Sequence, residues 1–151
     1  MHEPSADIEL RIRSDPRLLS VVRAAVEAAA RRMGMGERAA LELVASVDEA
    51  VCNVIRHGYR DAADQPVWIS LRELDRGGRK ALEVRIEDRT GCRPEDIAPR
   101  PFDPARPGGL GMNIIQRSMD TVCYDQRPDG SGLVQTLCKY LDPEPPATSR
   151  E

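Results

Sequence analysis

Aromatic residues are scarce in this chain of 151 residues, which holds one Trp, three Tyr and one Phe. Five scattered rings are too few to form the stacking platform on which single-stranded nucleic acids bind. Positive charge is not in excess either, since 22 Lys and Arg residues stand against 25 Asp and Glu residues. Such a balance provides no broad basic field to hold a phosphate backbone. We therefore do not expect nucleic acid as a direct partner.

Long apolar runs and paired cysteines are also missing. The sequence has no apolar stretch of about 18 residues, the length that a membrane-spanning helix requires. The opening residues, MHEPSADIEL, lack the basic and then apolar order of a secretory signal. The four cysteines, at positions 52, 92, 123 and 138, show neither a C-x-x-C pair nor the spacing of a zinc site. These absences predict a cytoplasmic protein with free thiols and no membrane partner.

Apolar residues recur with the periods of strands and helices along most of the chain. Strict alternation, as in residues 7–13, predicts a half-buried strand, and recurrence every three or four residues predicts a helix. The first helix has Asp15 and Pro16 at its start and Gly34 as a left-handed stop. Strands are expected at residues 7–13, 67–74, 81–87, 121–126 and 133–141, and helices at 18–33, 37–59 and 111–119.

The order of these elements predicts the fold class. Polar glycine turns at residues 75–79 and 128–130 join neighbouring strands as hairpins. Strands joined mostly by hairpins, with helices between them, predict an α+β fold, a two-layer α/β sandwich whose mixed, mostly antiparallel sheet carries helices on one face. One domain is expected over residues 7–141. Residues 1–6 and 142–151 are expected to be disordered, because the tail has three prolines and no large apolar residue.

Three polar residues share one side of the second expected helix. Glu49, Asn53 and His57 are spaced i, i+4 and i+8, so they fall within an arc of roughly 80° and rise by about 6 Å per step. The resulting ridge lies beside the apolar stripe of the helix and could point toward a ligand. The same spacing is also typical of an ordinary solvated face, because all three residue types are common on surfaces.

Two further features flank a long loop. Asp88 ends an expected strand and Gly91 follows it, so a carboxylate there could accept a hydrogen bond from an adenine amino group while the glycine admits close backbone approach. An Asp followed by Gly is equally typical of a simple turn. Residues 90–109 hold five prolines, too many for regular structure, and long loops inside compact domains are usually functional.

The loop ends in the run RPGGLGMN, which leads three glycines directly into an apolar helix. Backbone N–H groups of the glycines and the positive end of the helix together make a cradle for phosphate. The sequence contains neither a Walker A signature nor a strand-linked G-x-G-x-x-G, so the P-loop and dinucleotide-binding routes to phosphate are disfavoured.

Taken in this order, the three features resemble the ATP site of the gyrase, chaperone, histidine-kinase and MutL superfamily, whose domain is called the Bergerat fold. Residues 49–59 resemble its N box, residues 88–92 its first glycine box and residues 108–112 its second. The sequence DEAVCNVIRHGY and the short lid resemble those of the anti-sigma-factor serine/threonine kinases, and the similarity covers roughly residues 7–141. The chain is thus identified by resemblance as a member of that kinase family.

The resemblance implies a role for each residue. Asn53 would bind a Mg²⁺ ion that bridges the phosphates of ATP, Glu49 would act as the general base toward a serine or threonine hydroxyl, and Asp88 would bind adenine. The remaining nucleotide-binding residues implied by the family are His57, Gly91, Arg106, Gly108, Gly109, Leu110, Gly111 and Met112. Arg106 stands one place from the family's lid arginine, where it would offset charge on the transferred phosphoryl group.

The resemblance also implies partners: a sigma factor that the protein sequesters, an anti-anti-sigma antagonist with a STAS domain that it phosphorylates, and a second copy in a homodimer. Thr90 and Cys92 stand where the first glycine box usually has glycine, and Val134 where a threonine often follows the last glycine. The kinase remains the leading hypothesis, and the altered first glycine box is the best support for the alternative of a nucleotide-dependent binding module that transfers no phosphate. A histidine-kinase catalytic half is disfavoured, because no histidine-bearing helix pair precedes the ATP site in this sequence.

Overall fold

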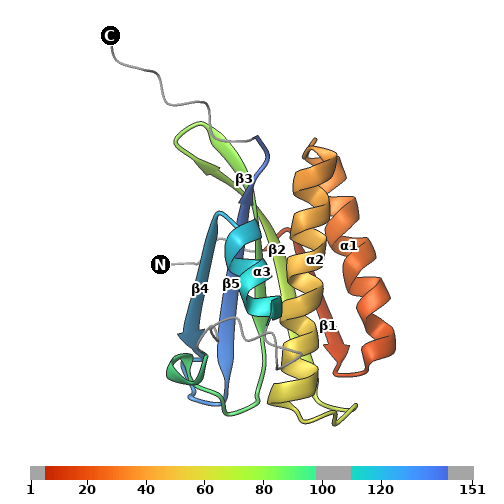
Figure 1. Cartoon of the computed structure of the whole chain (residues 1–151), viewed down its shortest axis with the longest axis vertical. Coiled ribbons are helices and arrows are strands. Elements are labelled where there is room, and N and C mark those ends of the chain that lie inside the picture. Colours follow the sequence, from red (N-terminus) through yellow and green to blue (C-terminus); the bar gives the residue numbers. More distant parts are fainter. Residues whose placement is uncertain (1–5, 98–109, 143–151) are drawn as a thin grey trace.

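In the described part of the chain, one antiparallel sheet carries the three α-helices on a single face (Figure 1). The structure, a computed structural model, describes residues 6–97 and 110–142. Its elements are β1 (Ile8–Arg13), η1 (Pro16–Leu18), α1 (Leu19–Arg32), α2 (Glu37–Asn53), η2 (Val54–Gly58), β2 (Pro66–Arg76), β3 (Arg79–Glu87), η3 (Pro94–Asp96), α3 (Leu110–Ser118), β4 (Thr121–Gln126) and β5 (Leu133–Tyr140). Most of the two flanks expected to be disordered lies outside the described residues.

The five strands lie in the order β1-β2-β3-β5-β4, and all four pairings are antiparallel. The expected α+β fold with a two-layer architecture is confirmed. The parallel pairing that a mixed sheet would contain does not occur among the described strands. The strands β3 and β4, which α3 connects, run in the same direction but are separated by β5, so they do not pair.

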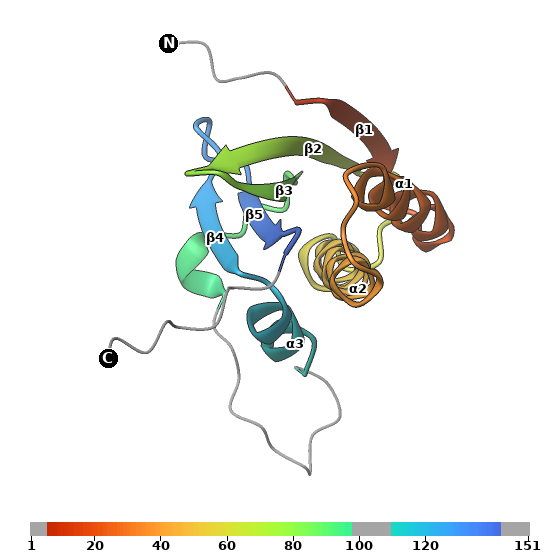
Figure 2. The same cartoon turned by 90° about the horizontal axis from the view of Figure 1, so that it is seen from above.

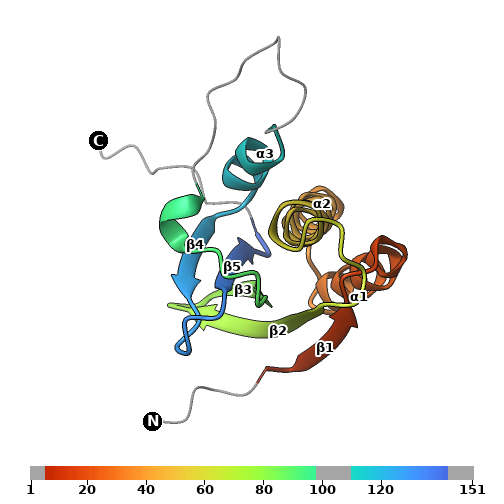
Figure 3. The same cartoon turned by 90° about the horizontal axis from the view of Figure 1, so that it is seen from below.

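The core lies between the sheet and the helices. Figures 2 and 3 show α2 between α1 and α3, with all three on the same side of the sheet. Alternation along β2 sends Val67, Ile69 and Leu71 into this core, where each is at most 1% exposed. Val47 and Val51 of α2 are equally buried on the opposite side. Burial of apolar surface on both layers fixes α2 as the central helix of the domain.

The first helical segment begins and ends at the residues that the sequence indicates. Asp15 accepts a hydrogen bond from the backbone N of Arg17 at 2.9 Å, and Pro16 opens η1, which continues into α1. Gly34 stands after α1 with a φ of 80°, the left-handed conformation that glycine adopts without strain. The expected single helix at residues 18–33 is therefore a short 3-10 turn followed by an α-helix.

The second helix changes its winding near its end. The α-helical hydrogen bonds of α2 give way after Asn53 to the π-helical turn η2, in which the backbone N of Tyr59 donates to the carbonyl O of Val54 at 2.8 Å. Single π-helical turns inside helices occur frequently at functional sites. The predicted helix over residues 37–59 is present, but its last turn is wider than α-helical geometry allows.

The hairpin between β2 and β3 is tighter than expected. Its turn consists of Gly77 and Gly78, which have φ values of 65° and 87°, while Asp75 and Arg79 belong to the strands. Two successive residues with positive φ match the twist of the flanking strands, and glycine adopts this conformation without strain. Within the described ranges, no helix is both long enough and apolar enough to cross a membrane.

Candidate functional site

Two residues of the polar ridge lie one turn apart on α2. Glu49 and Asn53 are both half-buried, because they stand at the edge of the helix face that packs on the sheet through Ala50. His57 belongs to η2 and its side chain is exposed. The change from α to π winding after Asn53 separates His57 from the direct line that regular helical spacing predicts.

The first turn of α3 lies directly against Glu49. A Cβ atom added at Gly111 would overlap the Cγ, Cδ and Oε1 atoms of Glu49, so the backbone of α3 approaches this carboxylate more closely than any side chain permits. Met112 follows in the same turn and is half-buried. The structure therefore brings the N box and the start of the second glycine box together.

Of the other predicted members of the phosphate loop, the structure describes only one. Leu110 is the first residue of α3. Arg106, Gly108 and Gly109 lie outside the described residues, so their roles stay predictions. The N-terminal end of a nine-residue helix presents unpaired backbone N–H groups and partial positive charge, which favour phosphate oxygens.

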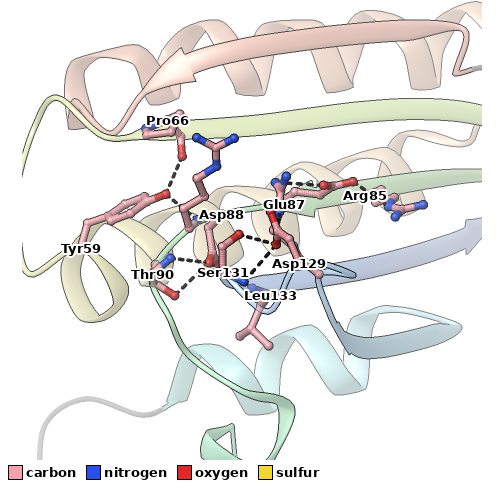
Figure 4. Close-up of polar contacts among 11 residues, drawn as sticks. Tyr59, Pro66, Arg85, Glu87, Asp88, Thr90, Asp129, Ser131 and Leu133 are labelled. Atoms are coloured by element: carbon pink, nitrogen blue, oxygen red, sulfur yellow. Dashed lines mark hydrogen bonds and ion pairs between the residues drawn. The ribbon is translucent and has the colours of Figure 1, made fainter.

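Asp88 is the most buried charged residue of the site, with 1% of its surface exposed. Its Oδ1 atom accepts three hydrogen bonds, from the backbone N of Thr90 at 3.0 Å, from Thr90 Oγ1 at 2.8 Å and from the backbone N of Leu133 at 3.2 Å (Figure 4). None of these three bonds uses Oδ2. The three hydrogen bonds to Oδ1 hold the carboxylate in one orientation. Its other oxygen, Oδ2, is the atom that could accept a hydrogen bond from a ligand.

Thr90, which replaces a glycine of the first glycine box, forms hydrogen bonds within that segment. Its hydroxyl donates to Asp88 and accepts from the backbone N of Cys92 at 3.2 Å. Its methyl group lies against Gly58, where an added Cβ would overlap it. Gly91 has a φ of 78° and its backbone N donates to the carbonyl O of Ser131 at 3.0 Å. The altered box is a hydrogen-bonded turn that depends on a glycine in η2.

Tyr59 is a site residue that the sequence argument did not assign. Its hydroxyl donates to the carbonyl O of Pro66 at 2.6 Å and accepts from the backbone N of Arg89 at 2.7 Å (Figure 4). Burial raises the pKa of this phenol above its ordinary value, which keeps it in the neutral donor form. Tyr59 therefore ties the end of the N box to the residue that follows Asp88.

Gly132 is a second site residue that the sequence argument did not assign. A Cβ added there would overlap the carbonyl O of Asp88 and crowd its Oδ1 atom, so only glycine fits between β5 and this carboxylate. Val134 stands where relatives often have a threonine, and it pairs with Glu87 in the strand register. The residue of β5 that contacts Asp88 is its neighbour Leu133. A glycine just before an expected strand was the available signal for Gly132, and it indicates close backbone approach.

These residues fit a nucleotide bound with a metal ion. The first turn of α3 offers backbone N–H groups to phosphate, and Asp88 offers an acceptor to an amino group. In the described part of the chain no three His, Cys, Asp or Glu side chains cluster to hold a metal. A metal at Asn53 would thus be held by one amide oxygen together with phosphate oxygens and water, the type of ligand set that Mg²⁺ prefers.

Comparison with known proteins agrees with this architecture. Residues 12–137 match the family described as the histidine kinase-like ATPase domain, so the chain belongs to that family. The serine-protein kinase RsbW of Bacillus pumilus (strain SAFR-032) is 28% identical, over 95% of this chain and 91% of that protein. The serine-protein kinase RsbW of Bacillus subtilis (strain 168) is 25% identical, over 91% of this chain and 87% of that protein. The family inferred from the three motifs is confirmed.

Solved structures share the fold. The RsbU and RsbW domains of a Mycobacterium tuberculosis protein superpose with a TM-score of 0.58 at 16% identity, over 90% of this chain and 33% of that longer chain. The SiaB–SiaC complex of Pseudomonas aeruginosa gives a TM-score of 0.57 at 13% identity, over 89% of this chain and 90% of that chain. Both similarities concern the arrangement of sheet and helices.

Proposed function

We propose that this chain is an ATP-dependent protein-serine/threonine kinase that acts as an anti-sigma factor. In this role it binds a sigma factor and phosphorylates an anti-anti-sigma antagonist with a STAS domain, as a homodimer in the cytoplasm. The family membership supports use of ATP, and the relatives named serine-protein kinase RsbW support transfer to a serine hydroxyl. The observation that carries the proposal is the contact of Glu49 with the first turn of α3.

That contact supports the proposal, because a carboxylate beside the start of α3 would be next to a phosphoryl group bound there. A phosphate held by the N–H groups at the start of α3 lies beside Gly111, and Glu49 touches the same turn. A carboxylate next to the transferred group can accept the proton of an incoming serine or threonine hydroxyl. Asn53, one turn further along α2, would hold Mg²⁺, which offsets negative charge on the phosphates when bound.

Two variants separate the roles of the ridge residues. Glu49→Ala is expected to reduce phosphoryl transfer by roughly 10²- to 10⁴-fold, the usual contribution of a general base, while nucleotide affinity changes little. Asn53→Ala is expected to lose both Mg²⁺-dependent affinity and transfer, because the metal would lose its protein ligand. Calorimetry with Mg-ATP and a transfer assay with radiolabelled ATP and a purified STAS-domain protein from the same organism measure the two quantities.

The results decide between distinct failures of the proposal. Transfer at the wild-type rate in Glu49→Ala would remove Glu49 as the base. Absence of any heat or thermal shift with millimolar nucleotide, for folded wild-type protein, would remove the ATP site itself. Glu37→Ala serves as the comparison variant on the same helix, since Glu37 is exposed in the first turn of α2, about three turns before Glu49.

A binding module without transfer is the second candidate, and one observation favours it. Thr90 replaces a glycine of the first box and fills the space beside Gly58 with its methyl group. A glycine at position 90 would leave this space empty and would allow the closer backbone approach to a nucleotide that the family's glycine permits. Wild-type protein that binds Mg-ATP but transfers no phosphate to the antagonist would support this candidate. Thr90→Gly would then be expected to tighten nucleotide binding.

A further inference from the structure

The sheet face opposite the helices carries an aromatic ring surrounded by arginines. Trp68 follows Val67 and precedes Ile69, which both point into the core, so its indole lies on the other face of β2. The guanidinium carbon of Arg11 is 5.7 Å from the ring centroid, that of Arg89 is 4.9 Å and that of Arg127 is 4.8 Å. We call these four residues the Trp68 cluster.

The positive charge of the Trp68 cluster is only partly neutralised within the protein. Arg127 lies 3.2 Å from a carboxylate oxygen of Glu87 and 3.6 Å from one of Asp129. Glu87 also pairs with a further arginine of β3 at 3.0 Å. Arg11 and Arg89 are exposed, and in residues 6–97 and 110–142 neither has a carboxylate within ion-pair distance. Three guanidinium groups around one ring thus leave two of them available to an external anion.

The position of Arg89 relates the Trp68 cluster to the candidate nucleotide site. Asp88 is buried toward the helices, whereas the side chain of the next residue, Arg89, stacks on Trp68 on the opposite face. The backbone N of Arg89 donates a hydrogen bond to the Tyr59 hydroxyl at 2.7 Å. This bond fixes the backbone from which the Arg89 side chain extends toward Trp68. A partner on the Trp68 cluster would therefore leave the helix side of the sheet open to nucleotide.

We infer that the Trp68 cluster is a docking surface for an acidic segment of a protein partner. Guanidinium groups bind carboxylates through paired N–H donors, and an aromatic ring beneath them holds the fork in place. Glu87 and Asp129 stand beside the cluster, so a long phosphate backbone that runs past the cluster would meet negative charge, whereas a short acidic segment would not. This recognition is independent of phosphoryl transfer and requires no bound nucleotide.

The single tryptophan of the chain makes this inference directly measurable, because all indole fluorescence arises at the docking surface. Titration of the full chain with hexaglutamate peptide at low salt is expected to give a saturable change in Trp68 emission. Arg11→Gln and Arg89→Gln should each weaken this binding by about two- to fivefold, and the double variant by more, since each exposed ion pair contributes modestly. Added salt should weaken it further.

Arg13→Gln is the matched control, because Arg13 is exposed on β1 two residues from Arg11 and makes no contact with the ring. Equal weakening by this variant would overturn the inference, as would the absence of a saturable emission change. Tighter binding of a hexathymidylate oligonucleotide than of hexaglutamate would also overturn it. Arg89→Lys keeps the charge but not the fork, and is expected to bind with an affinity between those of wild type and Arg89→Gln. Thermal unfolding of each variant verifies that it is folded.

Discussion

Glu49 and Gly111, 62 positions apart in the chain, meet so closely that the backbone of α3 occupies the place of a side chain. This contact holds the beginning of α3 against the C-terminal part of α2, while a second connection holds the end of α3. There, Lys139 of β5 donates hydrogen bonds both to Glu42 of α2 and to the carbonyl O of Ser118. Both ends of α3 are therefore held against α2, which sets the distance between the N box and the start of α3.

Gly111→Ala is expected to destabilise the protein and to reduce phosphoryl transfer. The new methyl group would overlap the end of the Glu49 side chain, which must move aside, so the carboxylate leaves its position and the cost is at the low end of the roughly 1–3 kcal/mol typical of overpacking. Denaturant unfolding and the transfer assay measure the two effects. In a Glu49→Ala background the same substitution should cost less, because the atoms that it meets have been removed.

Gly36→Ala is the control for this cycle, because a Cβ added at Gly36 meets no atom within 4 Å. Its effect on the free energy of unfolding should be small and unchanged by Glu49→Ala. Additive effects of Gly111→Ala and Glu49→Ala would show that the two residues do not touch in solution.

Asp88→Asn is expected to keep the fold and to weaken adenine nucleotides. Asparagine retains the Oδ1 acceptor for Thr90 and Leu133, so the change is confined to the replacement of Oδ2 by an amide NH₂. A donor in place of an acceptor should weaken binding of an adenine amino group by about tenfold or more. Calorimetry with Mg-ATP measures this, and an unchanged affinity with an unchanged melting temperature would argue that Asp88 has only a structural role.

Ser46→Ala is expected to stabilise the protein. Ser46 is fully buried on α2, and its Oγ atom finds no hydrogen-bond partner among the described residues. Removing an unsatisfied buried hydroxyl and gaining helix propensity should raise the free energy of unfolding by about 1 kcal/mol. Ala45→Ser, at the exposed position directly before Ser46 on α2, measures the propensity term with the opposite sign. A loss of stability in Ser46→Ala would show that the hydroxyl is satisfied, for example by a buried water molecule.

The ion pair of Glu42 predicts a loss of stability in acid. The hydrogen bond from Lys139 lowers the pKa of Glu42 below its ordinary value of 4.5, with a smaller contribution from Arg38, while burial opposes the shift. A lowered pKa contributes stability that is fully present above the ordinary value and is lost as the pH falls through the lowered one. The difference in unfolding free energy between wild type and Glu42→Gln should therefore be constant near neutral pH and shrink below 4.5.

Glu9→Gln provides the reference for this pH series, since Glu9 is exposed on the edge strand β1. Its difference from wild type should stay small over the whole range. A difference for Glu42→Gln that stays constant to the lowest pH would contradict a lowered pKa.

The strands, hairpins and helix ends could be predicted because each depends on neighbouring residues. Alternation along residues 7–13 and the stop at Gly34 require only local preferences, and both are present in the structure. The π-helical turn η2 was not predictable in this way. Val54 and Ile55 are both buried, so the apolar pattern continues through the turn and hides the change in winding.

The contacts around Asp88 depend on residues distant in sequence. Tyr59 and Gly132 reach the neighbourhood of Asp88 only after β2, β3 and β5 have paired. A glycine before an expected strand indicates close backbone approach, but it does not indicate which residue is approached. The motifs located Asp88, while two of the three donors to its Oδ1 atom are backbone N–H groups, which every residue type except proline carries. Tertiary packing therefore defines the part of the site that sequence patterns leave open.

The separation of 45 positions between Asp88 and Leu133 also determines when during synthesis the site is completed. Asp88 leaves the ribosome well before β5, and until β5 pairs with β3 its Oδ1 atom lacks the Leu133 N–H that helps to orient it. Closing so long a loop carries an entropic cost that local pairs such as the β2–β3 hairpin avoid. A nascent chain is thus expected to gain nucleotide affinity only once nearly the whole domain has emerged, late in translation.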